Sequence, residues 1–105
     1  MSPVPFVSPE PTRDAVDAMP GVVLLEFGIN ECPHCQRAQP LIADALARHP
    51  EVRHLRIEDG KGRCLGRTFS VKLWPALVFL KDGQEVARVL RPTTQPEVDQ
   101  GFAAL

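Results

Sequence analysis

The sequence predicts an α/β domain in which a central mixed β-sheet is flanked by helices on both faces. Three observations carry this prediction: an apolar run over residues 22–27, a helical pattern over residues 33–49, and an Asp82-Gly83 turn between two strand-like runs. A nearly unbroken apolar run is typical of a strand buried on both faces. Segments that alternate between strand and helix patterns favour a layered α/β fold. The expected element order is β-α-β-α-β-α-β-β-α, in one domain over residues 1–105.

The first elements are short. Prolines are frequent in the first dozen residues, and each removes a backbone donor, so residues 4–7 are expected to form an edge strand or an extended lead-in. A short helix is predicted over residues 12–18, ended by Met19-Pro20-Gly21.

The longest predicted helix covers residues 33–49. Pro33 suits its first position, where the missing N–H is harmless, and Pro40 is expected to kink it. Apolar side chains recur at spacings of three and four residues and form one stripe: Cys35, Ala38, Leu41, Ile42, Ala45 and Leu46.

The second half of the chain is predicted to add a strand over residues 52–57 and a short helix over residues 63–69. Asp-Gly between two strand-like runs is a strong hairpin signal, so residues 76–80 and 85–90 are expected to pair. Pro92 and Pro96 are expected to break the chain before a closing helix over residues 97–105, with Val98, Phe102 and Leu105 facing inward.

Composition excludes several classes of function. The net charge of −1 gives no electrostatic case for a nucleic acid partner. No apolar stretch is long enough for a membrane span, and the first residues lack the features of a signal peptide. These features predict a cytoplasmic protein with no membrane association. We also expect a monomer.

Charge is nevertheless distributed unevenly. Residues 53–72 contain two acidic residues, Glu58 and Asp59, among six basic ones: Arg53, Arg56, Lys61, Arg63, Arg67 and Lys72. This segment is either an ordinary solvated surface or a docking patch for an acidic partner.

The chemistry is expected at Cys32-Pro33-His34-Cys35, which follows the buried strand and opens the long helix. The thiolate is the reactive form of cysteine, and a helix N-terminus stabilises it through free N–H groups and the positive end of the helix dipole. Cys32 is therefore expected at the N-cap, with an exposed sulfur that is ionised near neutral pH. Cys35, one turn later, can close a disulfide with it.

His34 has two interpretations. A cationic imidazole between the cysteines favours the Cys32 thiolate and makes the disulfide a better oxidant. Alternatively, His34 is a surface residue with little effect.

A half zinc site is the other explanation of the Cys-x-x-Cys motif, but the remaining Cys and His residues have no second paired spacing. We therefore expect no metal and no cofactor. Cys64 is expected to be a small buried hydrophobe, with regulatory oxidation as the alternative.

Glu26 is a carboxylate in an apolar strand, so it must be paired, hydrated or protonated. Burial is expected to raise its pKa, which makes it a candidate proton acceptor for Cys35 through water. The alternative is an ordinary strand-end glutamate.

Together these residues resemble the thioredoxin family over nearly the whole chain. The Cys-x-x-Cys pair, Glu26 six residues before Cys32, Pro40, Trp74-Pro75 before the hairpin, and the Asp82-Gly83 turn all match family positions. The resemblance implies a thioredoxin fold, a cis Pro75 facing the cysteines, and a substrate-binding role for Trp74 and Pro75; Trp74 as a core residue is the alternative. It also implies that His54, where the family often has a lysine, is the partner of Glu26.

The sequence departs from common thioredoxins near the site. Glu31 replaces a tryptophan, Pro33-His34 replaces Gly-Pro, and Arg91-Pro92 replaces a stretch that usually holds glycine. Cys-Pro-His-Cys is more similar to bacterial disulfide-forming oxidases, which carry a helical insertion that this chain has no room for.

We therefore expect a thiol–disulfide oxidoreductase of cell redox homeostasis that reduces protein disulfides. Cys32 attacks, Cys35 resolves with help from Glu26, and a reductase or other electron donor restores the dithiol. The partners implied are disulfide-containing protein substrates and that donor. A more oxidising oxidase or isomerase, and a non-catalytic thioredoxin-like adapter or chaperone, remain as alternatives.

Overall fold

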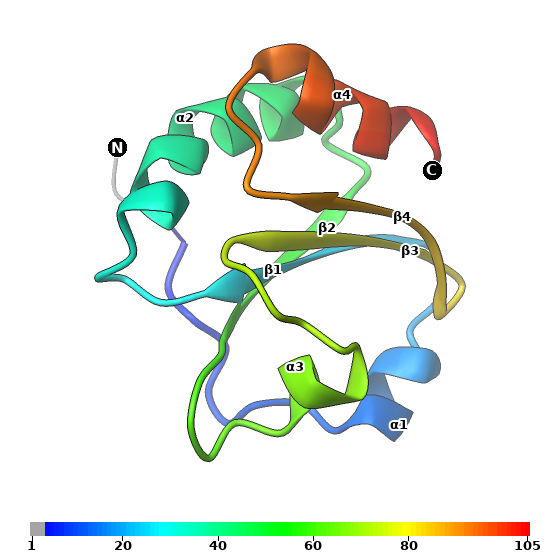
Figure 1. Cartoon of the computed structure of the whole chain (residues 1–105). Coiled ribbons are helices and arrows are strands. Elements are labelled where there is room, and N and C mark those ends of the chain that lie inside the picture. Colours follow the sequence, from blue (N-terminus) through cyan, green and yellow to red (C-terminus); the bar gives the residue numbers. More distant parts are fainter. Residues whose placement is uncertain (1–3) are drawn as a thin grey trace.

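A computed structural model describes residues 4–105 and confirms the α/β architecture (Figure 1). The elements in chain order are α1 (Arg13–Asp17), β1 (Val22–Gly28), α2 (Pro33–Arg48), β2 (Arg53–Glu58), α3 (Leu65–Thr68), β3 (Ala76–Lys81), β4 (Gln84–Leu90) and α4 (Gln95–Ala103). The strand order is β2-β1-β3-β4, with β1 parallel to β2 and antiparallel to β3. The sheet is therefore mixed, with β1 inside it.

Helices cover both faces of this sheet. Figure 1 shows α2 and α4 above the sheet and α1 and α3 below it. Alternate residues of β1 serve the two layers. Leu24 packs with buried residues of α2 and α4, whereas Val23, Leu25 and Phe27 pack with Val16 of α1 and Leu65 of α3. Glu26 follows Leu24 by two residues, so its side chain lies on the α2 face.

The hairpin forms where the Asp-Gly signal predicted it. Asp82 and Gly83 both have positive φ, 51° and 81°, as a two-residue turn that matches the twist of its strands requires. Thr12 caps α1 by accepting a hydrogen bond from the backbone N of Ala15.

Residues 4–7 form the extended lead-in, with a single parallel bridge between Phe6 and Arg56, so the strand at the start of the expected element order is not formed among the described residues. Two expectations about element bounds are wrong. The short third helix covers only Leu65–Thr68. The last helix begins at Gln95, because Pro96 falls in its first turn, where a missing N–H costs no helical hydrogen bond. Within residues 4–105, no helix has the length and apolarity needed to cross a membrane.

Candidate active site

Cys32 lies at the start of α2, one short loop after β1 ends at Gly28. It is the N-cap residue, and its Sγ accepts a hydrogen bond from the backbone N of Cys35 at 3.3 Å. The carbonyl oxygen of Trp74 lies 3.9 Å from the same sulfur. The predicted placement of the first cysteine at the helix N-cap is confirmed.

The sulfur is less accessible than expected. Cys32 is only 8% exposed, so the expectation of an exposed first sulfur is wrong. A substrate disulfide must therefore pack closely against the loops around Cys32 to reach it.

The pKa of Cys32 is nevertheless lowered. Burial raises the pKa, but the hydrogen bonds that its sulfur receives from the thiol and backbone N–H of Cys35 lower it. The backbone N–H of His34 and the positive charge of Arg91 act in the same direction. These contributions outweigh the desolvation, because a thiolate is a better acceptor than a thiol.

Cys35 has the opposite character. It is 2% exposed, and burial, followed by its hydrogen bond to Cys32, raises the pKa of its thiol to about 12. Gly28 faces it: a Cβ at this position would lie 2.7 Å from Cys35 Sγ. The site thus holds one acidic sulfur and one that remains a thiol at neutral pH.

Glu26 is buried beside α2 in a cluster of polar partners. Its Oε1 lies 2.8 Å from Nε2 of His54, and its Oε2 accepts hydrogen bonds from Nε2 of Gln39 at 2.6 Å and Nε of Arg56 at 3.3 Å. Arg56 is the register partner of Glu26 on β2. The expected pairing of Glu26 with His54 is confirmed.

These partners reverse the expected pKa shift of Glu26. Burial does raise the pKa, but the hydrogen bonds from His54 and Gln39, and then the charges of His54 and Arg56, lower it below its usual 4.5. The expectation of a raised pKa is wrong, because it considered desolvation without the donors that neighbouring elements bring to the carboxylate.

A cavity of about 110 Å³ lies beside Cys35. Cys35, Gln39 and Arg56 are among the residues that line it. Gln39 also donates to the carbonyl of Cys35 at 3.2 Å, so one side chain contacts both Glu26 and Cys35. The cavity gives water a place beside the second sulfur.

Trp74 and Pro75 form the loop that faces Cys32. The Trp74-Pro75 peptide bond is cis, as the resemblance implies. The indole N–H of half-buried Trp74 donates to Asp59 at 2.8 Å. The carbonyl of Trp74 is occupied, since Nε of Arg91 donates to it at 2.9 Å. A substrate strand that paired with this carbonyl would have to compete with Arg91.

The remaining predicted residues lie at the surface. His34 is exposed, and the contact that affects Cys32 comes from its backbone N–H. Cys64 is also exposed, so the expectation that it is buried is wrong. Among residues 4–105, no group of three or more Cys, His, Asp or Glu side chains could hold a metal ion.

Sequence reasoning missed three contributors to the site: Gln39, Arg56 and the side chain of Arg91. Gln39 follows Cys35 by four residues, a spacing that places both on one face of the helix. Arg56 follows His54 by two residues in a strand, so both face Glu26. Arg91 contacts the Trp74 carbonyl from a residue with a positive φ of 46°, and the sequence carries no signal for either feature.

Comparison with known proteins identifies the family. The family model described as Thioredoxin matches residues 4–103. The structure of thioredoxin 2 from Pseudomonas aeruginosa PAO1 in its reduced form is 50% identical, with a TM-score of 0.85, over 94% of this chain and 92% of that chain. A thioredoxin of Chlamydia trachomatis is 31% identical over 81% of each chain.

The match to thioredoxin H-type 1 of Nicotiana tabacum is 32% identical over 66% of this chain, but it spans only 55% of the tobacco protein. The family model and the bacterial thioredoxin structure, by contrast, cover nearly all of the present chain, including both cysteines. This chain therefore belongs to the thioredoxin family of thiol–disulfide oxidoreductases, with Cys32 and Cys35 as its Cys-x-x-Cys pair.

Proposed function

We propose that this protein reduces disulfide bonds in other proteins by dithiol–disulfide exchange. The observation that carries the proposal is the contrast between the two sulfurs: the pKa of Cys32 is lowered, whereas that of Cys35 is raised to about 12. Only one of them is a ready nucleophile, which fixes the order in which they react.

In the first step the Cys32 thiolate attacks a substrate disulfide. A bond forms between Cys32 and one substrate sulfur, and the other substrate sulfur leaves as a thiolate that takes a proton from water. In the second step Cys35 loses its proton and attacks the Cys32 sulfur. The Cys32–Cys35 disulfide forms, the second substrate sulfur leaves, and the substrate has gained two electrons. A reductase or another dithiol must then reduce the pair.

Glu26 takes part in the second step through its charge and its contacts. Its negative charge contributes to the raised pKa of Cys35, which keeps that sulfur protonated until the mixed disulfide has formed. Its own lowered pKa makes it a poor final proton acceptor. We therefore assign the proton of Cys35 to the substrate thiolate that leaves in this step, with water in the cavity lined by Cys35, Gln39 and Arg56 as the carrier.

Trp74, Pro75 and Arg91 belong to the substrate-binding loop in this proposal. Their proximity to Cys32 supports this assignment. His34 contributes to the acidity of Cys32 through its backbone N–H.

We place the reaction in the cytoplasm, where reducing systems can restore the dithiol. Cell fractionation, with an antibody that detects the protein in each fraction, tests that placement.

The test of the function is the reduction of insulin by dithiothreitol, which the protein should accelerate. Cys32→Ser should abolish the acceleration. Cys35→Ser should leave a substrate held on Cys32 as a mixed disulfide, visible on a non-reducing gel. A wild-type protein that left the insulin reaction at its uncatalysed rate would support the adapter alternative instead.

The oxidising direction remains a second candidate, because a stabilised Cys32 thiolate stabilises the reduced form and makes the disulfide a better oxidant. Equilibration with glutathione buffers separates the two directions. A couple as oxidising as those of disulfide-forming oxidases, about −120 mV, would favour the oxidase, whereas a potential near −270 mV would favour the reductase.

A further inference from the structure

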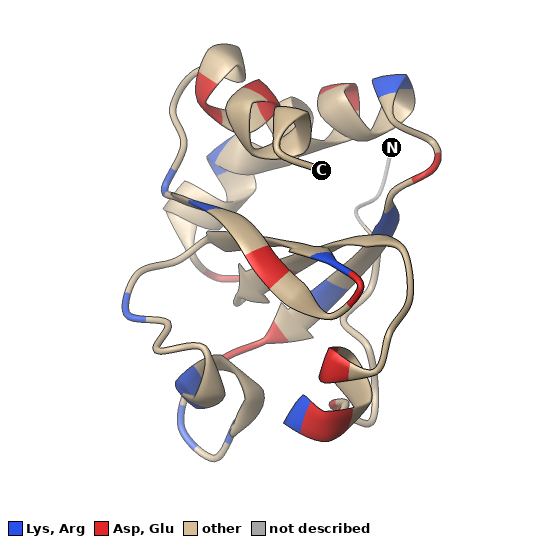
Figure 2. Ribbon diagram, turned by 90° about the vertical axis from the view of Figure 1, so that its right-hand side faces the viewer, with Lys and Arg blue, Asp and Glu red and all other residues tan. Residues whose placement is uncertain are grey.

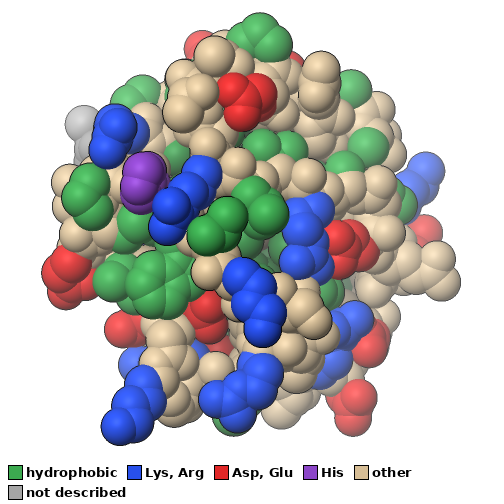
Figure 3. Space-filling view, viewed as in Figure 1, with side chains coloured by type: hydrophobic (Ala, Val, Ile, Leu, Met, Phe, Trp, Pro, Cys, Tyr) green, Lys and Arg blue, Asp and Glu red, His purple; other side chains and the backbone are tan. Residues whose placement is uncertain are grey.

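Basic side chains gather on one face of the molecule, next to the active site. Figure 2 shows acidic residues on α1 and α4, at the bottom and top of that view, while α3 and the loops around it carry Lys and Arg. In the space-filling view, Lys and Arg side chains cluster over the middle and lower part of the face that Figure 1 presents (Figure 3).

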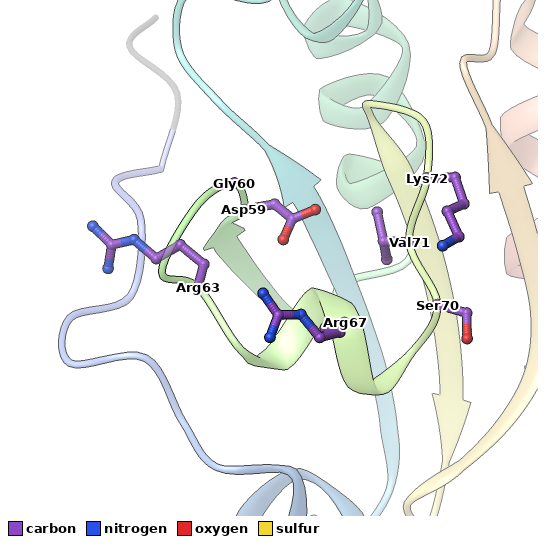
Figure 4. A pocket seen from close by; sticks show the side chains of 7 residues that line it. All are labelled: Asp59, Gly60, Arg63, Arg67, Ser70, Val71 and Lys72. Atoms are coloured by element: carbon purple, nitrogen blue, oxygen red, sulfur yellow. The ribbon is translucent and has the colours of Figure 1, made fainter.

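Part of this face is hollowed into a pocket of about 290 Å³, which we call the basic pocket. Asp59, Arg63, Arg67, Ser70 and Lys72 are among the residues that line it. Figure 4 shows the guanidinium of Arg67 reaching toward the middle of the group and Arg63 pointing away from it. The pocket lies between α3 and the loop that leads from α3 to Trp74.

Two of its cations are free to meet a ligand. Arg63 forms an ion pair with Glu58 at 3.2 Å, and the Asp59 carboxylate already accepts the indole N–H of Trp74. Arg67 and Lys72 are both exposed, and neither forms an ion pair within residues 4–105. Asp59 keeps its negative charge when it accepts the indole hydrogen bond, but Arg67 and Lys72 together outweigh it, so the pocket presents a net positive charge to solvent.

The basic pocket is connected to the reacting sulfur. Asp59 lines the pocket and holds the Trp74 indole at 2.8 Å, and the carbonyl of Trp74 lies 3.9 Å from Cys32 Sγ. A protein whose disulfide reached Cys32 would place its neighbouring residues over this surface.

We propose that the basic pocket, through Arg67 and Lys72, binds an acidic segment that flanks the disulfide of the protein substrate. The inference rests on the proposed function, and it specifies that the preferred protein substrates carry negative charge beside their disulfide. Charge complementarity supports it: the free guanidinium of Arg67 can bind a carboxylate with two parallel hydrogen bonds, and the Lys72 ammonium adds a point charge. Charges at the edge of an interface mainly raise the association rate.

The test compares two synthetic peptides with the same intramolecular disulfide, flanked by glutamates in one and by glutamines in the other. The rate constant for their reduction by the pre-reduced protein is measured in stopped flow. We expect the glutamate peptide to react about 10-fold faster at low ionic strength. This ratio should approach one at roughly 1 M salt, where the screening length falls to about 3 Å.

The variant R67E/K72E should reverse the preference, so that the glutamine peptide reacts faster. The neutral variant R67Q/K72Q should bring the ratio close to one, and it serves if the charge reversal impairs folding. The matched control is R53E/K81E, which changes the net charge by the same amount at the opposite end of β1, beside Val23 and Val22. The control should keep the wild-type ratio.

Two results would overturn the inference while leaving the proposed function intact: a wild-type ratio of one at low salt, or an equal loss of preference in the control variant. Failure of every variant, including wild type, to reduce the glutamine peptide or insulin would instead reject the proposed function, and this inference with it.

Discussion

Nε2 of His54 lies 2.8 Å from Oε1 of Glu26, inside the face of the sheet that α2 covers. The carboxylate only accepts, so this ring nitrogen carries the proton. Both side chains are buried, with 11% and 2% of their surfaces exposed. The pair, together with Arg56 and Gln39, forms a buried polar network beside the apolar core.

The first prediction concerns the stability of Glu26→Gln. The substitution removes the negative charge but leaves His54 and Arg56 buried without their ionic partner, and breaking a buried pair in this way costs about 3 kcal/mol. Urea unfolding at neutral pH should show a loss of this size. Glu31→Gln, at an exposed position beside Cys32, should change stability by less than about 0.5 kcal/mol. Equal effects of the two substitutions would contradict the network's role.

The second prediction concerns pH. The pKa of Glu26 in the folded protein is below its usual 4.5, so the unfolded chain takes up this proton first as the pH falls. The stabilisation from Glu26 is therefore complete above about 4.5 and is lost as the pH falls through the folded-state pKa. The stability difference between wild type and Glu26→Gln should shrink steadily below pH 4.5. A difference that grew in this range would mean that the folded-state pKa is raised.

The sequence predicted the elements well because each carried a local signal. Asp82-Gly83 marked the hairpin, Pro33 marked the start of α2, and the apolar run of β1 marked the centre of the sheet. The bounds that failed were those where local rules conflict. The sequence predicts that Pro96 breaks the chain before the last helix. In the structure Pro96 lies in the first turn of α4, where proline is tolerated.

The site was predicted only in part, because its electrostatics depend on contacts between distant residues. Glu26 was recognised as a buried acid, but the sign of its pKa shift depends on Gln39 from α2 and His54 from β2. The exposure of Cys64 likewise follows from its tertiary position before α3, and nothing in its neighbours along the chain indicates it.

The third prediction concerns Arg91, whose positive charge lowers the pKa of Cys32 and whose Nε binds the Trp74 carbonyl. Arg91→Ala should raise the Cys32 pKa, measured by the ultraviolet absorbance of the thiolate, and should slow alkylation of Cys32 at neutral pH. Arg91→Lys keeps the charge and should restore most of the acidity.

Arg91→Gly separates this electrostatic effect from backbone strain. It also removes the charge and the hydrogen bond to Trp74, but it suits the φ of 46° and should therefore be about 1 kcal/mol more stable than Arg91→Ala. A Cys32 titration that was identical in all these variants would show that Arg91 acts only on the loop.

The fourth prediction distinguishes the side chain of His34 from its backbone. The backbone N–H of His34 donates to the Cys32 sulfur and helps to lower its pKa, whereas the imidazole is exposed. His34→Ala keeps the N–H, so the Cys32 titration should change little. His34→Pro removes the N–H, and proline is tolerated in the first turn of a helix, so the Cys32 pKa should rise while α2 persists. Thiolate absorbance against pH, with circular dichroism to check the helix, measures both effects. If the Ala and Pro variants raised the pKa of Cys32 equally, the side chain of His34 and not its backbone N–H would be the source of the acidity.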